Sequence, residues 1–144
     1  MSLVKFESIK KLLRDDNKDK HRQELFKEVM LMVLSRATRV DSNVEAVEIA
    51  KVQEVLKEQL GQDFSDADIR TAASSAVFES QSIERYLSSA TRKLDERERV
   101  VILASLATVI RSDDEIRFFE LDFFDKVALA LRATPSEIAG LIAV

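Results

Sequence analysis

The sequence predicts an all-α protein, a single-domain helical bundle of about seven or eight helices covering residues 1–144. The whole chain contains 2 glycines and 1 proline, and a β-rich fold would need many more of them at its tight turns. Hydrophobic residues make up 46% of the chain and charged residues 33%, which is typical of a folded soluble domain. The apolar residues recur at the three- and four-residue spacing of amphipathic helices.

The first two predicted helices lie on either side of a polar run over residues 15–20. Residues 3–14 form a short amphipathic helix, with apolar positions at Leu3, Phe6, Ile9, Leu12 and Leu13. The second helix extends from His21 to Thr38, and its second half is apolar almost all round. A helix with so little polar surface must be surrounded by other helices, so we expect it at the centre of the bundle.

Capping signals mark the next two helices. Asp41 or Ser42 caps a helix that ends at Gly61, because a glycine just past the last turn is a common stop signal. Ser65 opens the following helix, and Asp68 stands where the acid of a capping box is expected.

The second half of the chain repeats this organisation. Two short helices with a break near residues 80–82 precede Asp95, which caps a nearly all-apolar and therefore central helix ending near Ile110. Another apolar helix follows Asp113. Thr134 caps the last helix, with a proline at the favoured first position.

An acidic turn occurs twice, 72 positions apart. In each copy an aspartate precedes a glutamate by seven residues, Asp41 before Glu48 and Asp113 before Glu120. Each turn joins an apolar helix to an amphipathic one, and a capped short helix follows in both halves. We therefore expect two pseudo-symmetric helical-hairpin halves that share one core.

The acids of the two turns are the candidate metal ligands, namely Asp41 and Glu48 in the first copy and Asp113, Asp114 and Glu120 in the second. Clustered carboxylates suit hard cations such as Ca²⁺ or Mg²⁺. Neither copy has the central glycine or the closing acid of an EF-hand, so we expect weak binding. The alternative is that these acids only cap helices and favour the positive ends of helix dipoles.

The sequence lacks the residues that other kinds of catalytic or cofactor site require. The chain has no cysteine, which excludes disulfides, thiolate metal sites and cysteine nucleophiles. His21 is the only histidine and is expected to be exposed, so it cannot supply a three-ligand metal site. Neither a glycine-rich phosphate loop nor a G-x-S-x-G motif is present. We therefore expect no catalytic residue and no enzymatic activity.

The charge and hydropathy patterns of the sequence indicate where the protein is located and which partners it lacks. The formal net charge is −4 with no basic run, which argues against nucleic-acid binding. The first 13 residues are too charged for a signal peptide. The longest apolar run, residues 100–110, is about half the ~20 residues that span a bilayer. We expect a cytoplasmic protein without direct membrane insertion.

Four phenylalanines, Phe118, Phe119, Phe123 and Phe124, form the one aromatic cluster of the sequence. Helical geometry places Phe119 and Phe123 on one face and turns Phe118 toward another. One interpretation assigns all four to the core. The other places Phe118 on an exposed patch that binds a protein partner or a second copy of the chain, as a homodimer.

Both acidic turns resemble the signature of TerB-like domains, which belong to tellurite-resistance proteins and also occur at the N-terminus of a membrane-anchored DnaJ-type co-chaperone. Two stretches carry the resemblance, residues 34–44 with Glu48 and residues 106–116 with Glu120. It extends through the capped short helices and covers residues 20–144 in round figures.

This resemblance implies an all-α fold of two pseudo-symmetric halves, a cytoplasmic location, no known catalysis and an interaction role in stress responses to tellurite and other toxic agents. It also implies protein partners, including a membrane-associated complex, and a divalent cation held by the acidic residues. The family commonly has glycine after the motif aspartate, where this chain has Ser42 and Asp114. These two residues make a left-handed turn less easy than glycine does.

Three hypotheses for function follow. The first is a non-enzymatic TerB-like interaction module with a weak divalent-cation site. The second is a carboxylate-based metal-dependent enzyme, although di-metal helical bundles usually present Glu-x-x-His motifs, which this chain lacks. The third is a purely structural homo-oligomeric helical protein that assembles through the Phe118 face.

Overall fold

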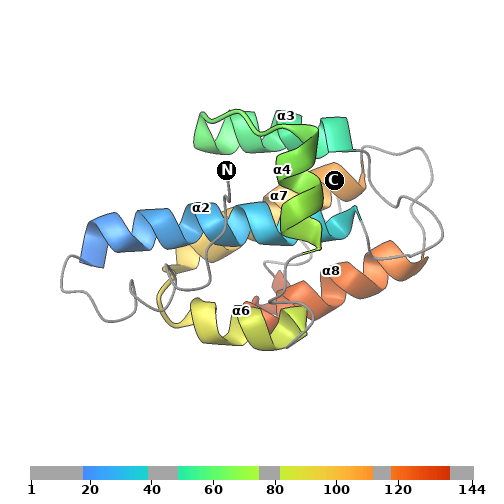
Figure 1. Ribbon diagram of the computed structural model, residues 1–144. Coiled ribbons are helices and arrows are strands. Elements are labelled where there is room, and N and C mark those ends of the chain that lie inside the picture. The colour runs from blue at the N-terminus through green and yellow to red at the C-terminus, as the bar shows by residue number, and fades with distance from the viewer. Residues whose placement is uncertain (1–17, 39–48, 75–81, 112–117, 137–144) are drawn as a thin grey trace.

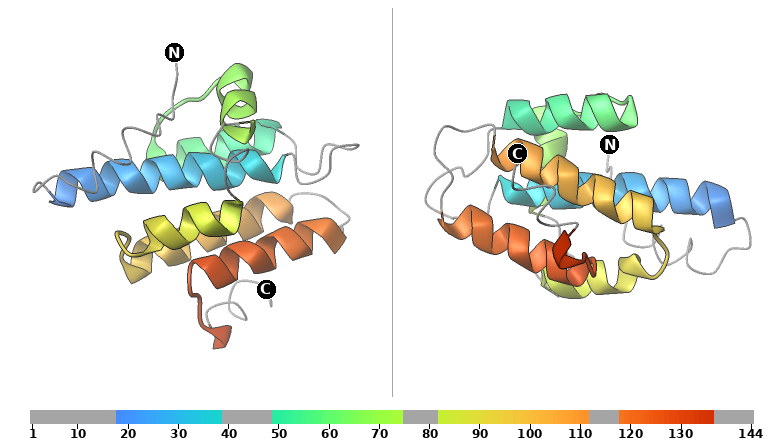
Figure 2. Two further views of the ribbon diagram at one scale, coloured as in Figure 1. Left: turned by 60° about the horizontal axis from the view of Figure 1, so that its bottom comes forward. Right: turned by 180° about the vertical axis from the view of Figure 1, so that it is seen from behind.

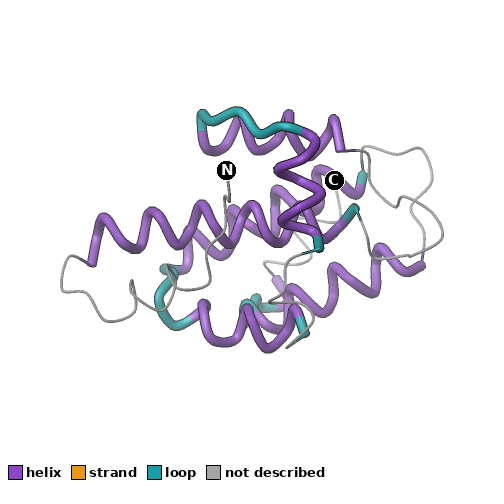
Figure 3. Tube along the Cα trace, in the orientation of Figure 1, coloured by secondary structure: helices purple, strands orange, loops and turns teal. Residues whose placement is uncertain are grey.

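Helices are the only regular elements in the stretches that the computed structural model describes, residues 18–38, 49–74, 82–111 and 118–136 (Figure 3). These stretches contain six helices: α2 (Lys18–Ala37), α3 (Ile49–Leu60), α4 (Asp66–Ala73), α6 (Ile83–Thr91), α7 (Glu96–Ile110) and α8 (Phe118–Ala130). The all-α prediction is therefore confirmed, with six helices in the described stretches rather than seven or eight. The predicted helix over residues 3–14 lies outside them. None of the six helices is long and apolar enough to cross a bilayer.

Helix α2 runs through the middle of the molecule, with α3 and α4 above it and α6 and α8 below it in the view of Figure 1. Figure 2 shows from behind that α7 lies alongside α2 between these two layers. The packing contacts agree, because α2 touches α3, α4, α6 and α7, while α7 touches α3 and α8. We call α3 with α4 the upper layer and α6 with α8 the lower layer.

The central position of α2 follows from its sequence. Seven consecutive residues of this helix are buried: Val29, Met30, Leu31, Met32, Val33, Leu34 and Ser35. Only a helix covered on every side can bury a full two turns, so this prediction is confirmed. Helix α2 begins at Lys18, whereas the sequence predicted a loop up to residue 20 and a helix from His21. That prediction was wrong because charged residues also form good helix turns when the helix continues into a packed segment.

Helix α7 is the second central helix, and it is covered less completely than α2. Ile102, Leu103 and Leu106 are at most 1% exposed. Val100 and Val101, near its first turn, are partly exposed. The end of α7 is therefore deeper in the core than its start.

The predicted caps of three helices are confirmed. Ser65 Oγ accepts the Asp68 N–H at 3.1 Å, and the Asp68 carboxylate accepts the Ser65 N–H at 2.9 Å, which is a complete capping box at the start of α4. Asp95 makes the same box at the start of α7. Gly61 follows α3 with φ 66°, and its N–H donates to the Lys57 carbonyl at 2.9 Å.

One continuous core joins all six helices. Each large aliphatic side chain buried in it contributes roughly 1.5–3 kcal/mol relative to an exposed one. Helix α3 packs on α2 and α8 packs on α7, as two helical hairpins would. The pseudo-twofold relation between the halves stays a prediction.

Candidate functional site

The predicted metal ligands fall mostly outside the part of the chain that the structure describes. Asp41, Glu48, Asp113 and Asp114 lie in residues 39–48 and 112–117, so their cation site stays a prediction. The described residues contain no group of three or more His, Asp or Glu side chains that could hold a metal ion.

Glu120 is the one predicted ligand that the structure places. It lies in the first turn of α8, directly after the second acidic turn, and is 1% exposed. A buried carboxylate is stable only when a cation, a hydrogen-bond donor or a proton offsets its lost hydration. An acid in the first turn of a helix usually interacts with the positive end of the helix dipole from an exposed position. Glu120 differs from such an acid because its side chain is buried.

The outer face of α8 is the most apolar exposed surface among the described helices. Leu129 is 78% exposed and Leu121 is 44% exposed, and they are the exposed large hydrophobic residues of the described stretches. Asp122, Asp125 and Lys126 are exposed beside them, and the Lys126 ammonium lies 3.2 Å from the Asp122 carboxylate. The sequence did not predict this surface, because the helix is apolar on so many positions that its periodicity selects no inner face.

Phe118, the predicted partner-binding residue, is the first residue of α8. Its side chain is not among those that the structure describes, so its exposure stays a prediction. At 100° per residue, position 118 comes within about 20° of position 129 around the helix axis. The predicted contact residue and the exposed leucine therefore stand on the same side of α8.

Helix α3 occupies the corresponding place after the first acidic turn, and its outer face is polar. At the 72-residue offset of the repeat, Ile49 corresponds to Leu121 and Lys57 to Leu129. Ile49 is 7% exposed. The Lys57 ammonium lies 3.1 Å from the Asp63 carboxylate. Comparing the two copies position by position would therefore have identified Leu129 as an apolar residue on a face that is charged in the other copy.

The C-terminal end of α8 is held by two features. The Thr91 hydroxyl at the end of α6 donates to the Ala130 carbonyl at 3.0 Å, and this joins the ends of the two lower helices. Arg132 follows α8 with φ 57°, and the Ala133 N–H donates to the Ala128 carbonyl at 3.0 Å, which is the arrangement of a Schellman motif. Glycine is the usual residue at this left-handed position, so Arg132 adopts a strained backbone conformation.

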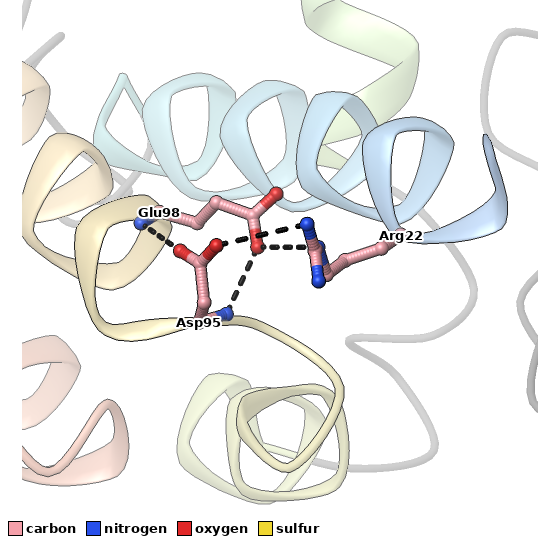
Figure 4. Close-up of polar contacts among 3 residues, drawn as sticks. All are labelled: Arg22, Asp95 and Glu98. Atoms are coloured by element: carbon pink, nitrogen blue, oxygen red, sulfur yellow. Dashed lines mark hydrogen bonds and ion pairs between the residues drawn. The ribbon is translucent and has the colours of Figure 1, made fainter. Parts of the chain in front are cut away.

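A charged cluster ties the start of α2 to the start of α7 (Figure 4). The Arg22 guanidinium lies 3.4 Å from a Glu98 carboxylate oxygen and 3.8 Å from an Asp95 carboxylate oxygen. The same two acids form the capping box of α7. Burial raises the pKa of the Glu98 carboxyl, and Arg22 opposes that shift. Because every member also serves a helix cap or an ion pair, this cluster is structural.

A titratable pair lies between α2 and α6. Burial is the main cause that raises the pKa of Glu28 to about 7, and the negative charge of Glu24 one turn earlier adds to it. Burial also raises the pKa of the Tyr86 phenol, with a further contribution from Glu28. Tyr86 is 3% exposed. No sequence motif predicts this pair, because it depends on which faces of α2 and α6 meet.

A comparison with protein-family models agrees with the sequence-based resemblance. The model described as tellurite resistance protein TerB matches residues 27–142. The comparisons with curated proteins and with solved structures gave no significant match. The matched region includes both acidic turns and all of α3, α4, α6, α7 and α8.

Proposed function

Because the chain belongs to the tellurite resistance protein TerB family, we propose that it is a non-enzymatic interaction module of a tellurite-resistance or related stress response. It binds a protein partner through the outer face of α8. The observation that carries this proposal is the exposure of Leu129, whose side chain is 78% exposed near the C-terminal end of α8. Glu120, in the first turn of the same helix, is buried. The matching position in α3 is a lysine in an ion pair.

The energetics favour covering this face. Burying a leucine side chain contributes roughly 1.5–3 kcal/mol, and an apolar centre with a charged rim is the usual composition of a binding surface. On this face Asp125 lies one helical turn from each leucine, and the Asp122–Lys126 ion pair is exposed beside them. The partner surface that fits is an apolar pocket flanked by lysine or arginine side chains.

A complementation assay tests the proposal. We expect Leu129→Glu to lower survival on tellurite to the level of a strain without the gene, because a charge at the centre of an interface typically costs 2 kcal/mol or more, about 30-fold in affinity. Gln59→Glu is the matched control, since it adds the same charge at an exposed position of α3. Both proteins should keep the wild-type circular dichroism spectrum. Full resistance with Leu129→Glu would show that this face does not carry the function.

The cation site of the two acidic turns is the second part of the proposal. Its support is the family membership together with the burial of Glu120 beside the second turn. Calorimetric titration of the protein with Ca²⁺, Mg²⁺ and Mn²⁺ tests it, and we expect weak binding that is lost in an Asp41→Asn/Asp113→Asn variant. Heat that persists in this variant would move the site elsewhere, and no heat with wild-type protein would reject it.

The remaining expectations concern location and assembly. We propose a cytoplasmic protein whose partners include a membrane-associated complex and do not include nucleic acid. Family membership supports this proposal, as does the absence of a basic run from the sequence. A carboxylate-dependent enzyme and a structural homo-oligomer stay the alternatives, and an activity that depends on the acids of the turns would favour the enzyme.

A further inference from the structure

Helices α6 and α8 lie side by side in the lower layer, and their C-terminal ends are joined by a hydrogen bond (Figure 1). The Thr91 hydroxyl, at the end of α6, donates to the Ala130 carbonyl, at the end of α8, at 3.0 Å. Arg92 directly follows Thr91 and Leu129 directly precedes Ala130, so each is about 3.8 Å between Cα atoms from the bonded pair. The hydrogen bond therefore brings the exposed Leu129 close to the turn that follows α6.

Three basic residues follow these two helix ends. Arg92 and Lys93 come directly after α6, and Arg132 comes two residues after the last residue of α8. All three are exposed, and none of them makes an ion pair or a side-chain hydrogen bond with a described residue. We call Arg92, Lys93 and Arg132 the basic trio.

The backbone of Arg132 indicates that its side chain has a role outside the fold. Arg132 has φ 57°, a left-handed conformation that glycine adopts without strain. A basic side chain elsewhere in the last turn would interact with the negative end of the helix dipole without this strain. Local backbone strain is retained where a residue has a functional role. The Arg132 guanidinium is therefore available for a contact outside the chain.

The charge changes sign along the outer face of α8. Asp125 comes one turn before Leu129, and Arg132 comes three residues after it. Asp125 is exposed and, like the basic trio, makes no ion pair with a described residue. A surface that covers Leu129 is therefore complementary when it carries a basic residue toward Asp125 and carboxylates toward the basic trio.

We propose that the basic trio binds carboxylate side chains of the protein partner, next to the apolar residue that covers Leu129. The partner therefore contributes an acidic segment that includes an apolar residue. Guanidinium groups suit this contact, because they pair with a carboxylate through two parallel hydrogen bonds. An anionic lipid surface fits less well, because it would repel Asp125 on the same face. This inference rests on the proposed function, since it takes the outer face of α8 as the binding surface.

Selection from a displayed library of short random peptides tests the charge of the ligand. The immobilised full chain selects the peptides, after those that also bind Leu129→Ala have been removed. We expect Asp and Glu to be about twofold more frequent in the selected peptides than in the library, because opposite charges favour binding. A selection without this enrichment would overturn the proposal.

The affinity of a selected acidic peptide for single variants tests the basic trio. We expect Arg132→Gly and Arg92→Ala each to weaken binding about tenfold, through the loss of one charge-assisted contact. Arg70→Ala is the matched control, because Arg70 is exposed on α4 in the upper layer, and it should bind the peptide as the wild type does. Arg132→Gly also removes the backbone strain, so thermal unfolding should show no loss of stability in this variant. Unchanged affinity in both Arg132→Gly and Arg92→Ala would contradict the proposal.

Co-sedimentation with phosphatidylcholine vesicles, with and without phosphatidylserine, tests the lipid alternative. We expect the full chain to bind neither kind of vesicle. Binding to the phosphatidylserine vesicles that is lost in Arg132→Gly would overturn the proposal in favour of a lipid surface.

Survival on tellurite separates this inference from the proposed function. Lost resistance with Leu129→Glu, together with full resistance of an Arg92→Ala/Arg132→Gly variant, would reject the acidic partner and keep the function. Acidic peptides that bind through the basic trio, together with full resistance of Leu129→Glu, would reject the function of this face and keep its preference for acidic ligands.

Discussion

The upper layer of α3 and α4 and the lower layer of α6 and α8 lie on opposite sides of α2 (Figure 1). The upper layer closes its surface with polar contacts, whereas the lower layer leaves two leucines of α8 exposed. In the upper layer Gln53 of α3 donates to the Phe64 carbonyl and to the Asp66 carboxylate, both at 2.9 Å. Arg36 of α2 donates to the Ala73 carbonyl at the end of α4 at 3.1 Å. These contacts join the upper layer to the link between its helices and to α2.

The lower layer combines three features that do not favour stability. Leu129 is exposed, Arg132 has a left-handed backbone, and burial raises the pKa of the Tyr86 phenol in α6, with a further contribution from Glu28 of α2. Both layers cover the same two central helices, so the burial of the core does not explain the difference. Proteins tolerate exposed apolar surface and local strain where a surface has a role other than packing. The comparison therefore supports the proposal that the partner binds on the side of the lower layer.

The largest expected effect is on the free energy of unfolding when a leucine of each layer is replaced by alanine. Leu56 on the inner face of α3 is 0% exposed, and Leu56→Ala should lower the free energy of unfolding by about 2–5 kcal/mol. Leu129→Ala on the outer face of α8 should change it by no more than ~0.5 kcal/mol. Urea denaturation measures both. A large cost for Leu129→Ala would mean that Leu129 is buried in solution and would remove the distinction between the layers.

The next largest effect concerns the two residues with a left-handed backbone, Gly61 after α3 and Arg132 after α8. No atom lies within 4 Å of a Cβ added at Gly61, so Gly61→Ala meets no clash. The left-handed conformation costs alanine ~1–2 kcal/mol, and the smaller freedom of alanine in the unfolded chain leaves a net loss of roughly 0.5–1 kcal/mol. Arg132→Gly should relieve the same strain, and the greater freedom of glycine in the unfolded chain should leave a net gain of roughly 0.5–1 kcal/mol. Thermal unfolding of both variants gives the two signs. A loss of stability in Arg132→Gly would show that the arginine side chain contributes more than its backbone strain costs.

The smallest effect is the pH dependence of the contact between α2 and α6. The folded-state pKa of Glu28 is about 7, above its ordinary value of 4.5, so the folded protein binds this proton more tightly than the unfolded chain. The contribution of Glu28 to stability is fully present below pH 4.5 and is lost as the pH rises to about 7. Because the side chain is partly exposed, the slope should be well below the ~1.4 kcal/mol per pH unit of a fully coupled proton.

A Glu28→Gln variant isolates this group from the other titrating acids, including Glu98, whose pKa burial also raises. Urea denaturation at several pH values from 4 to 8, compared between wild type and variant, measures the difference. We expect the free energy of unfolding to fall more steeply with pH in the wild type. Parallel curves would show that Glu28 has an ordinary pKa in the folded protein.

Much of the fold follows from residues close together in the sequence. The caps at Ser65 and Asp95 and the stop at Gly61 are interactions within about four residues, so their side-chain chemistry predicts them. The apolar run in α2 predicts a central helix because it leaves no polar face. The predicted start of α2 was three residues too late, because a charged first turn gives no sharp sequence signal.

The candidate site was less predictable, because it depends on contacts between helices that are distant in the sequence. Sequence identified α8 and the acid Glu120, and family membership is consistent with the predicted TerB-like region. It did not identify Leu129, because a helix with apolar residues on most of its positions does not reveal which side its neighbours cover. The Glu28–Tyr86 pair was missed because a raised pKa depends on burial between two helices that are distant in sequence.

The sequence by itself determined the helical class, the caps and the two central helices, because each depends on composition or on contacts within one turn. Only the tertiary structure decided that Leu129 is exposed, that Glu28 contributes to the raised pKa of Tyr86, and that the end of α6 is hydrogen-bonded to the end of α8. These properties depend on how helices pack across the core. The helices that follow the two acidic turns therefore differ at one matching position of their outer faces, where α3 carries the charged Lys57 and α8 carries the exposed Leu129.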